Sequence, residues 1–189
     1  MPQRPRIGLA LGSGSAKGLA HLGVLRVLEQ HSIPIDYIAG SSIGAVIGAY
    51  YAQNPTINAL EELVYKLSER NLTSVLDLSI KGGLIKGNKI ETLLRETLKT
   101  DSFDSLQIPF AAVATDLTNA DSVSFTRGDL IKALRASSAI PGFLRSIEYD
   151  GRFLADGGLS NPVPVDVVRA MGADIVIAVN SLANSEPLD

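Results

Sequence analysis

One pentapeptide in this chain of 189 residues has the residue types and spacing of a nucleophilic site. Gly40–Gly44, GSSIG, fits the pattern G-x-S-x-G, in which a reactive serine occupies a tight turn between a strand and a helix. Backbone N–H groups at a helix N-terminus favour the negative charge that develops when a hydroxyl attacks a carbonyl carbon. Ser42 is therefore a candidate nucleophile; the alternative is that it only caps a helix starting at Ile43.

A second glycine-rich segment, GSGSAKG from Gly12 to Gly18, follows an apolar run and could direct backbone N–H groups at an oxyanion or a phosphate. A dinucleotide site needs G-x-G-x-x-G, but three residues separate Gly14 from Gly18. A P-loop needs a hydroxyl residue after Gly-Lys, whereas Lys17 precedes its glycine here. Nucleotide binding is thus the weaker interpretation, and a plain strand-to-helix turn stays open.

The serine needs a base, and neither histidine has the expected order in the chain. In α/β-hydrolases the histidine follows the nucleophile, but His21 and His31 both precede Ser42. Asp156 is the best alternative, because it ends an apolar run and is followed by the flexible pair Gly157-Gly158. A carboxylate can act as a base when partial burial raises its pKa. The alternative is that Asp156 is an ordinary turn aspartate with no catalytic role.

Composition excludes several other functions. The net charge of −3 with scattered Lys and Arg gives no basic stripe, so a nucleic-acid partner is not expected. The chain has no cysteine and two histidines, which argues against disulfides and against a metal or other cofactor. Its apolar runs are shorter than the 18 or so residues that span a bilayer, so we expect a cytoplasmic protein, with peripheral membrane contact left open.

Short apolar runs alternate with helical patterns along the chain. Because this alternation is typical of βα units, we expect an α/β fold in which helices cover both faces of a mostly parallel sheet. The expected strands are Ile7–Leu11, Tyr37–Ala39, Phe110–Ala114 and Asp174–Val179. The expected helices are Gly18–Gln30, Ile43–Ala52, Ile90–Leu98 with Asn88 as N-cap, and Val163–Met171.

Two segments do not follow the alternation of strand and helix patterns. Residues 71–89 show no sustained period and are expected to be a loop-rich insertion, whose leucines could line an acyl channel or, more simply, be core. The pair Asp150-Gly151 predicts a hairpin.

With 46% hydrophobic residues, the whole of 1–189 is expected to be a single domain. Its polar C-terminal end suggests that a C-terminal part of a longer protein is missing.

The segments GSGSAKG, GSSIG and DGG, in this order and together with ASSAIPG and NPVPV, resemble the bacterial patatin-like phospholipase family. The resemblance extends from Ile7 to about Val179. It implies a three-layer α/β/α patatin-like fold with a mostly parallel central sheet. It also implies a catalytic dyad without histidine, in which Ser42 is the nucleophile and Asp156, 114 residues later, is the base.

The resemblance also assigns roles to the glycine-rich turns. The residues it implies for an oxyanion hole, through their backbone N–H groups, are Gly12, Ser13, Gly14 and Ser15. The residues that support the motifs are Lys17, Gly18, Gly40, Gly44, Gly157 and Gly158. The family's first loop is usually a run of glycines, whereas this chain has serines at Ser13 and Ser15. Which of the N–H groups donates to the oxyanion is therefore left open. Lys17 could brace the loop, meet a lipid phosphate or simply be exposed.

The implied activity is hydrolysis of a phospholipid or another fatty-acyl ester through an acyl-enzyme, without calcium or another cofactor. Two alternatives stay open: a thioesterase or acyltransferase acting on other acyl carriers, and a non-catalytic lipid-binding regulatory module.

Overall fold

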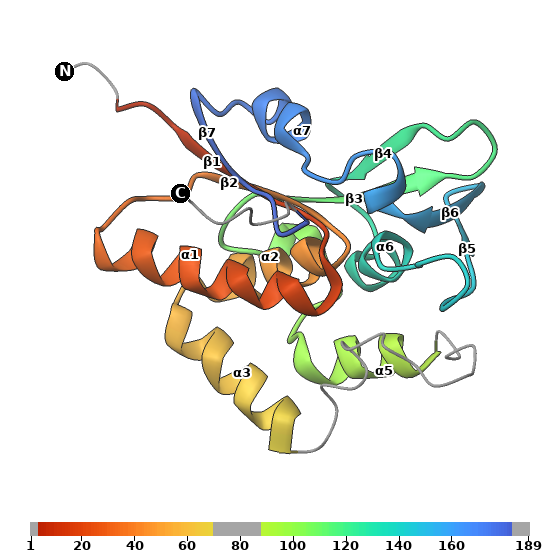
Figure 1. Cartoon of the computed structure of the whole chain (residues 1–189), viewed down its shortest axis with the longest axis horizontal. Coiled ribbons are helices and arrows are strands. Elements are labelled where there is room, and N and C mark those ends of the chain that lie inside the picture. Colours follow the sequence, from red (N-terminus) through yellow and green to blue (C-terminus); the bar gives the residue numbers. More distant parts are fainter. Residues whose placement is uncertain (1–3, 70–87, 183–189) are drawn as a thin grey trace, which may run out of the picture.

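The computed structural model describes residues 4–69 and 88–182, and its centre is a seven-stranded sheet (Figure 1). The strands are β1 (Ile7–Leu11), β2 (Tyr37–Ser41), β3 (Phe110–Asp116), β4 (Ser122–Phe125), β5 (Ile147–Tyr149), β6 (Arg152–Asp156) and β7 (Ile175–Val179). The sheet has the order β5-β6-β3-β2-β1-β7, and β4 also pairs with β3. The neighbours β3, β2, β1 and β7 run parallel, whereas β4, β5 and β6 pair antiparallel.

Helices lie on both faces of this sheet (Figure 1). The α-helices are α1 (Ala20–Gln30), α2 (Ile43–Gln53), α3 (Ile57–Glu69), α5 (Asn88–Thr97), α6 (Leu130–Ser137) and α7 (Val165–Ala170). The short 3-10 helices within the described residues are η1 (Ser15–Leu19), η2 (Phe103–Ser105) and η3 (Gly157–Leu159). Helix α7 covers one face; α1, α2 and α6 cover the other, and α3 and α5 lie farther out on that side.

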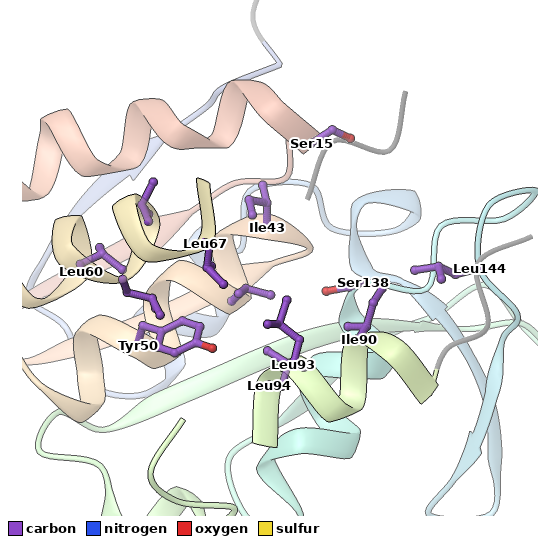
Figure 2. A pocket seen from close by; sticks show the side chains of 13 residues that line it. Ser15, Ile43, Tyr50, Leu60, Leu67, Ile90, Leu93, Leu94, Ser138 and Leu144 are labelled. Atoms are coloured by element: carbon purple, nitrogen blue, oxygen red, sulfur yellow. The ribbon is translucent and has the colours of Figure 1, made fainter. Parts of the chain in front are cut away.

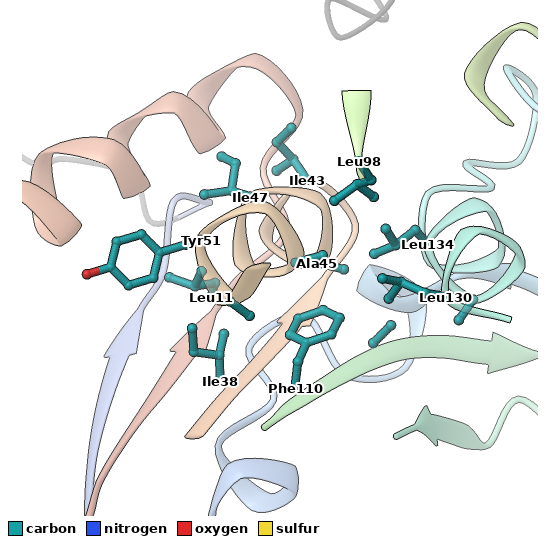
Figure 3. Close-up of a cluster of buried hydrophobic side chains, with 14 of the residues drawn as sticks. Leu11, Ile38, Ile43, Ala45, Ile47, Tyr51, Leu98, Phe110, Leu130 and Leu134 are labelled. Carbon is teal, nitrogen blue, oxygen red and sulfur yellow. The ribbon is translucent and has the colours of Figure 1, made fainter. Parts of the chain in front are cut away.

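The two faces of the sheet have cores of different size. The larger core joins leucine, isoleucine and phenylalanine side chains of β1, β2 and β3 to α2 and α6 (Figure 3). The smaller one consists of Ala10, Ala39 and Ala111 of the sheet, Val168 of α7, and Ala173. Small residues on that face let α7 approach closely: a Cβ atom on Gly8 would lie 2.0 Å from the Val168 side chain.

Helix α2 packs directly on the parallel strands because its sequence, IGAVIGAYYAQ, is rich in small residues. A Cβ atom on Gly48 would already lie 3.0 Å from the side chains of Ile38 and Phe110. A helix buried on most of its surface in this way is held in a fixed position by the sheet. The residue that precedes α2 is Ser42, so its backbone is fixed as well.

The predicted α/β fold with a mostly parallel central sheet is confirmed, and the four strands predicted individually are present as β1, β2, β3 and β7. Strands β2 and β3 extend two residues farther than expected, to Ser41 and Asp116, and the hairpin of β5 and β6 forms at Asp150-Gly151. Helices α3 and α6 and strand β4 are present but were not predicted from the sequence. The loop-rich insertion expected at 71–89 falls outside the described residues up to 87, and α5 begins at Asn88.

Candidate active site

Ser42 occupies a strained turn of one residue between β2 and α2. Its φ of 56° and ψ of −124° are uncommon for a residue with a side chain, and such backbone strain typically costs about 1–3 kcal/mol. The flanking glycines are required by close backbone contacts. A Cβ atom on Gly40 would lie 2.4 Å from the Gly44 carbonyl oxygen, and one on Gly44 would lie 2.2 Å from the Leu11 carbonyl oxygen.

The structure brings the two predicted catalytic side chains together. The Ser42 hydroxyl donates a hydrogen bond of 2.6 Å to Oδ2 of Asp156, and each residue is 5% exposed. Asp156 ends β6, which pairs with β3, and β3 in turn lies beside β2. Because the strand order places these ends at one edge of the sheet, residues 114 positions apart in sequence become neighbours.

Three further contacts hold Asp156 in place. Its N–H donates to the carbonyl oxygen of Ala139, its carbonyl oxygen accepts from the Thr115 hydroxyl, and its Oδ1 accepts from the Gly158 N–H. Burial raises the pKa of the carboxyl, and hydrogen bonds from Ser42 and Gly158 oppose this rise. A desolvated carboxylate with a raised pKa is a stronger base than one in water.

Ser137 also supports the strained turn, a role that the sequence does not predict. Its hydroxyl, at the end of α6, accepts a hydrogen bond of 2.9 Å from the Ser42 N–H. The only signal in the sequence is that Ser137 falls in the segment ASSAIPG. The contact fixes the first N–H group ahead of α2, which would otherwise be an unpaired buried donor.

The first glycine-rich loop offers fewer free N–H groups than the sequence predicts. The N–H of Gly12 donates to Val179, and that of Ser13 donates to Pro162, each over 2.9 Å to a carbonyl oxygen. Within the described residues, the N–H groups of Gly14 and Ser15 have no acceptor, because they precede or begin η1. Of the four predicted donors, only Gly14 and Ser15 therefore keep a free N–H group within the described residues.

His21 anchors this loop rather than contacting the serine. Its ring is fully buried, and Nε2 lies 2.8 Å from the Gly12 carbonyl oxygen. Since a carbonyl oxygen only accepts, Nε2 carries the proton, and burial lowers the pKa of the ring and keeps it neutral. Nδ1 has no partner among the described residues.

The other predicted motif residues pack around the same point. A Cβ atom on Gly157 would lie 2.2 Å from the Val113 carbonyl oxygen, and one on Gly158 would lie 2.8 Å from Oγ of Ser13. A Cβ atom on Gly18 would meet the Ile43 side chain at 2.3 Å. Lys17, in contrast, is exposed, and its side chain has no ion pair or hydrogen bond within the part of the chain described.

An apolar groove lies between α2, α3 and α5 (Figure 2). It encloses a cavity of about 70 Å³. Its lining residues are Ser15, Ile43, Val46, Tyr50, Leu60, Leu63, Val64, Leu67, Ile90, Leu93, Leu94, Ser138 and Leu144. Ser15 and Ile43 place one part of the groove next to Ser42, so a substrate acyl chain attached at the serine could enter it.

Comparison with known families decides the identity of this arrangement. The family model of patatin-like phospholipases matches residues 9–169, which include both glycine-rich turns, Ser42 and Asp156. The chain belongs to the patatin-like phospholipase family. At the level of the family, the activity is hydrolysis of lipid acyl esters.

Relatives of this patatin-like chain occur in bacteria and animals. An uncharacterized NTE family protein of Mycobacterium tuberculosis is 43% identical over 183 residues, 96% of this chain and 50% of the relative. Patatin-like phospholipase domain-containing protein 7 of Rattus norvegicus is 34% identical over 92% of this chain and 13% of that protein. The chain thus spans about half the length of its mycobacterial relatives.

The patatin-like fold also has a counterpart among solved structures. The crystal structure of VipD from Legionella pneumophila matches with a TM-score of 0.57 and 13% sequence identity, covering 85% of this chain and 47% of that one. At this identity the likeness concerns the fold. Among the described residues, no helix has the length and apolar character needed to cross a bilayer.

Proposed function

We propose that this chain is a serine lipid acyl hydrolase in which Ser42 is the nucleophile and Asp156 the general base. The observation that carries the proposal is the buried hydrogen bond of 2.6 Å from the serine hydroxyl to the carboxylate. A base within this distance can take the proton as the hydroxyl oxygen attacks. The family assignment supports the same class of reaction.

The reaction proceeds in two halves. The Ser42 oxygen attacks the ester carbonyl carbon while its proton passes to Asp156, and the protonated carboxyl then gives that proton to the departing alcohol. The serine is left as an acyl ester. Water next attacks this ester, Asp156 accepts one proton from the water, and the fatty acid leaves as the serine oxygen regains that proton.

The negative oxygen of each tetrahedral intermediate needs hydrogen-bond donors. We assign this role to the free N–H groups of Gly14 and Ser15, because the N–H groups of Gly12 and Ser13 already have acceptors. The N-terminus of α2 adds the favourable field of its backbone dipoles. Donors fixed in this way are worth about 10²–10³-fold in rate when one is removed from a serine hydrolase.

The groove suggests the substrate class. The described residues that line it are almost all aliphatic or aromatic and none is charged, which suits a hydrocarbon chain better than a polar acyl group. The expected substrates are phospholipids, lysophospholipids or other fatty-acyl esters, reached by peripheral contact with a lipid surface.

A fluorophosphonate probe tests the nucleophile directly. We expect the probe to label the wild-type chain and to leave Ser42→Ala unlabelled, with Ser41→Ala as the matched control that keeps the labelling. Ser41 is the neighbouring buried serine, and its hydroxyl has no partner among the described residues. An unlabelled wild type would favour a non-catalytic lipid-binding module instead.

A substrate panel then separates the enzyme classes. We expect turnover of p-nitrophenyl and phospholipid esters at a rate well above that of acyl-thioesters. Preference for thioesters, or transfer of the acyl group to an added alcohol, would assign the serine to a thioesterase or an acyltransferase.

A further inference from the structure

The groove has a defined end on the side away from Ser42. Ile43, Val46 and Tyr50 lie three and four residues apart on α2 and therefore line the groove from one face of that helix. An α-helix rises about 1.5 Å per residue, so the seven steps from Ile43 to Tyr50 span about 10 Å along α2. Figure 2 shows the Tyr50 ring at the opposite side of the groove from Ser15.

Tyr50 joins α2 and α5, two of the three helices that form the walls of the groove. Its hydroxyl forms a hydrogen bond with the hydroxyl of Thr97, the last residue of α5. Burial raises the pKa of Tyr50 to about 12, so the phenol stays neutral at physiological pH. The ring therefore stands across the space between α2 and α5, fixed at its outer end.

A second cavity lies beyond Tyr50. It is larger, about 700 Å³, and more polar, since Gln53, Asn54, Lys66 and Gln107 contribute to its lining. The residues that line both cavities are Tyr50, Leu60 and Leu63. These three side chains thus separate the apolar groove beside the serine from a polar cavity behind it.

We propose that Tyr50 is a specificity-determining residue that limits the length of the acyl chain accepted at Ser42. The proposal rests on the proposed function. An acyl chain of a membrane lipid reaches across half of a hydrocarbon core that is about 30 Å thick, or about 15 Å. Ile43 and Tyr50 are about 10 Å apart along α2, so acyl groups of medium length would end before the Tyr50 ring and longer ones would meet it.

A series of p-nitrophenyl esters from butanoate to hexadecanoate tests this length limit. For the wild type we expect kcat/KM to be highest at medium length, near octanoate, and at least tenfold lower for hexadecanoate. In Tyr50→Ala the two cavities join, and we expect the hexadecanoate-to-octanoate ratio of kcat/KM to rise about tenfold. That change equals about 1.4 kcal/mol of transition-state free energy.

The matched control is Tyr50→Phe, which removes the hydrogen bond to Thr97 and keeps the ring. We expect it to retain the wild-type length profile. If Tyr50→Ala does not fold by circular dichroism, Tyr50→Leu makes a smaller opening and should shift the ratio in the same direction.

Two results would overturn the length limit: a wild-type profile that does not fall at hexadecanoate, or a folded Tyr50→Ala or Tyr50→Leu variant with the wild-type profile. Failure of the proposed function is a different result, in which Ser42 is not labelled by the fluorophosphonate and no ester of the series is hydrolysed.

Discussion

Around Ser42 the chain segments meet through backbone atoms, whereas in the neighbouring groove the helices meet through side chains. Added Cβ atoms on Gly40, Gly44 and Gly157 would lie between 2.2 and 2.4 Å from carbonyl oxygens, well inside contact distance. In the groove the opposed groups are leucine, isoleucine and valine side chains, which can change rotamer.

This difference matches the precision that each region needs, the site around Ser42 and the apolar groove. A base, a nucleophile and oxyanion donors must hold their positions to a fraction of an ångström, and backbone packing provides this. An acyl chain is flexible and needs only an apolar surface of sufficient length. We therefore expect substitutions near the serine to abolish function and substitutions in the groove to adjust it.

The largest effect is expected from Asp156→Asn. An asparagine can keep both contacts, accepting from the Gly158 N–H and donating to the Ser42 oxygen, but it cannot accept the serine proton. We expect kcat to fall by about 10²–10⁴-fold in an ester assay with a folded variant. Turnover close to that of the wild type would remove Asp156 as the base.

Although Asp156→Asn should lower kcat, it should not lower the stability of the fold. Because burial raises the pKa of Asp156, the folded protein binds this proton more tightly than the unfolded chain does. Ionisation above the raised pKa therefore lowers the free energy of unfolding, and this loss is relieved as the pH falls through that pKa. At pH 7 we expect the variant to be at least as stable as the wild type by thermal melting.

Gly44→Ala is expected to have the next largest effect. The new methyl group would meet the carbonyl oxygens of Leu11 and Gly12 at 2.2 and 2.6 Å, and neither strand β1 nor α2 can move without disturbing the core. We expect a loss of about 3 kcal/mol or more in the free energy of unfolding measured with urea.

Two substitutions serve as its controls. Gly23 lies exposed within α1, and a Cβ atom there meets nothing within 4 Å, so Gly23→Ala should stabilise the protein by about 0.5–1 kcal/mol. Leu93→Met, in the groove, should cost less than about 1.5 kcal/mol. If Gly44→Ala changed the free energy of unfolding as little as these two substitutions, the close contacts of Gly44 with the Leu11 and Gly12 carbonyl oxygens would not be needed for stability.

A smaller effect is expected from His21→Leu, which removes the hydrogen bond to the Gly12 carbonyl oxygen and keeps an apolar side chain. Displacing the oxyanion loop by about 1 Å should lower kcat about 10²-fold with little change in KM. His21→Gln can still donate to Gly12 and should recover part of the loss. Equal activity of the leucine variant and the wild type would show that the loop holds its position without this contact.

The parts of the molecule that could be predicted are those encoded locally. The apolar run Ile7–Leu11, the small residues of α2 and the glycines beside Ser42 each reflect a single local requirement, such as burial or close approach. Strand β4 was missed because its four residues, alternately exposed and buried, are too short to distinguish from a loop.

The contacts that the sequence could not reveal join distant residues. The Ser137 hydroxyl reaches the Ser42 N–H across 95 positions, and no spacing rule links a helix end to a strand end so far away. The same holds for the N–H of Gly12, which donates to Val179 on the neighbouring β7. Which N–H groups of the glycine-rich loop stay free is therefore decided by the assembled sheet.

The pairing of β6 with β3, in which Asp156 stands opposite Ala114, also restricts how this family member can vary in length. Side chains of a strand alternate between its two sides, so a slip of one residue would turn the carboxyl away from the serine while leaving the sheet intact. Insertions should be accepted in the tip of the β5–β6 hairpin at Asp150-Gly151, whereas a single residue added within β6 should give a folded protein with no activity.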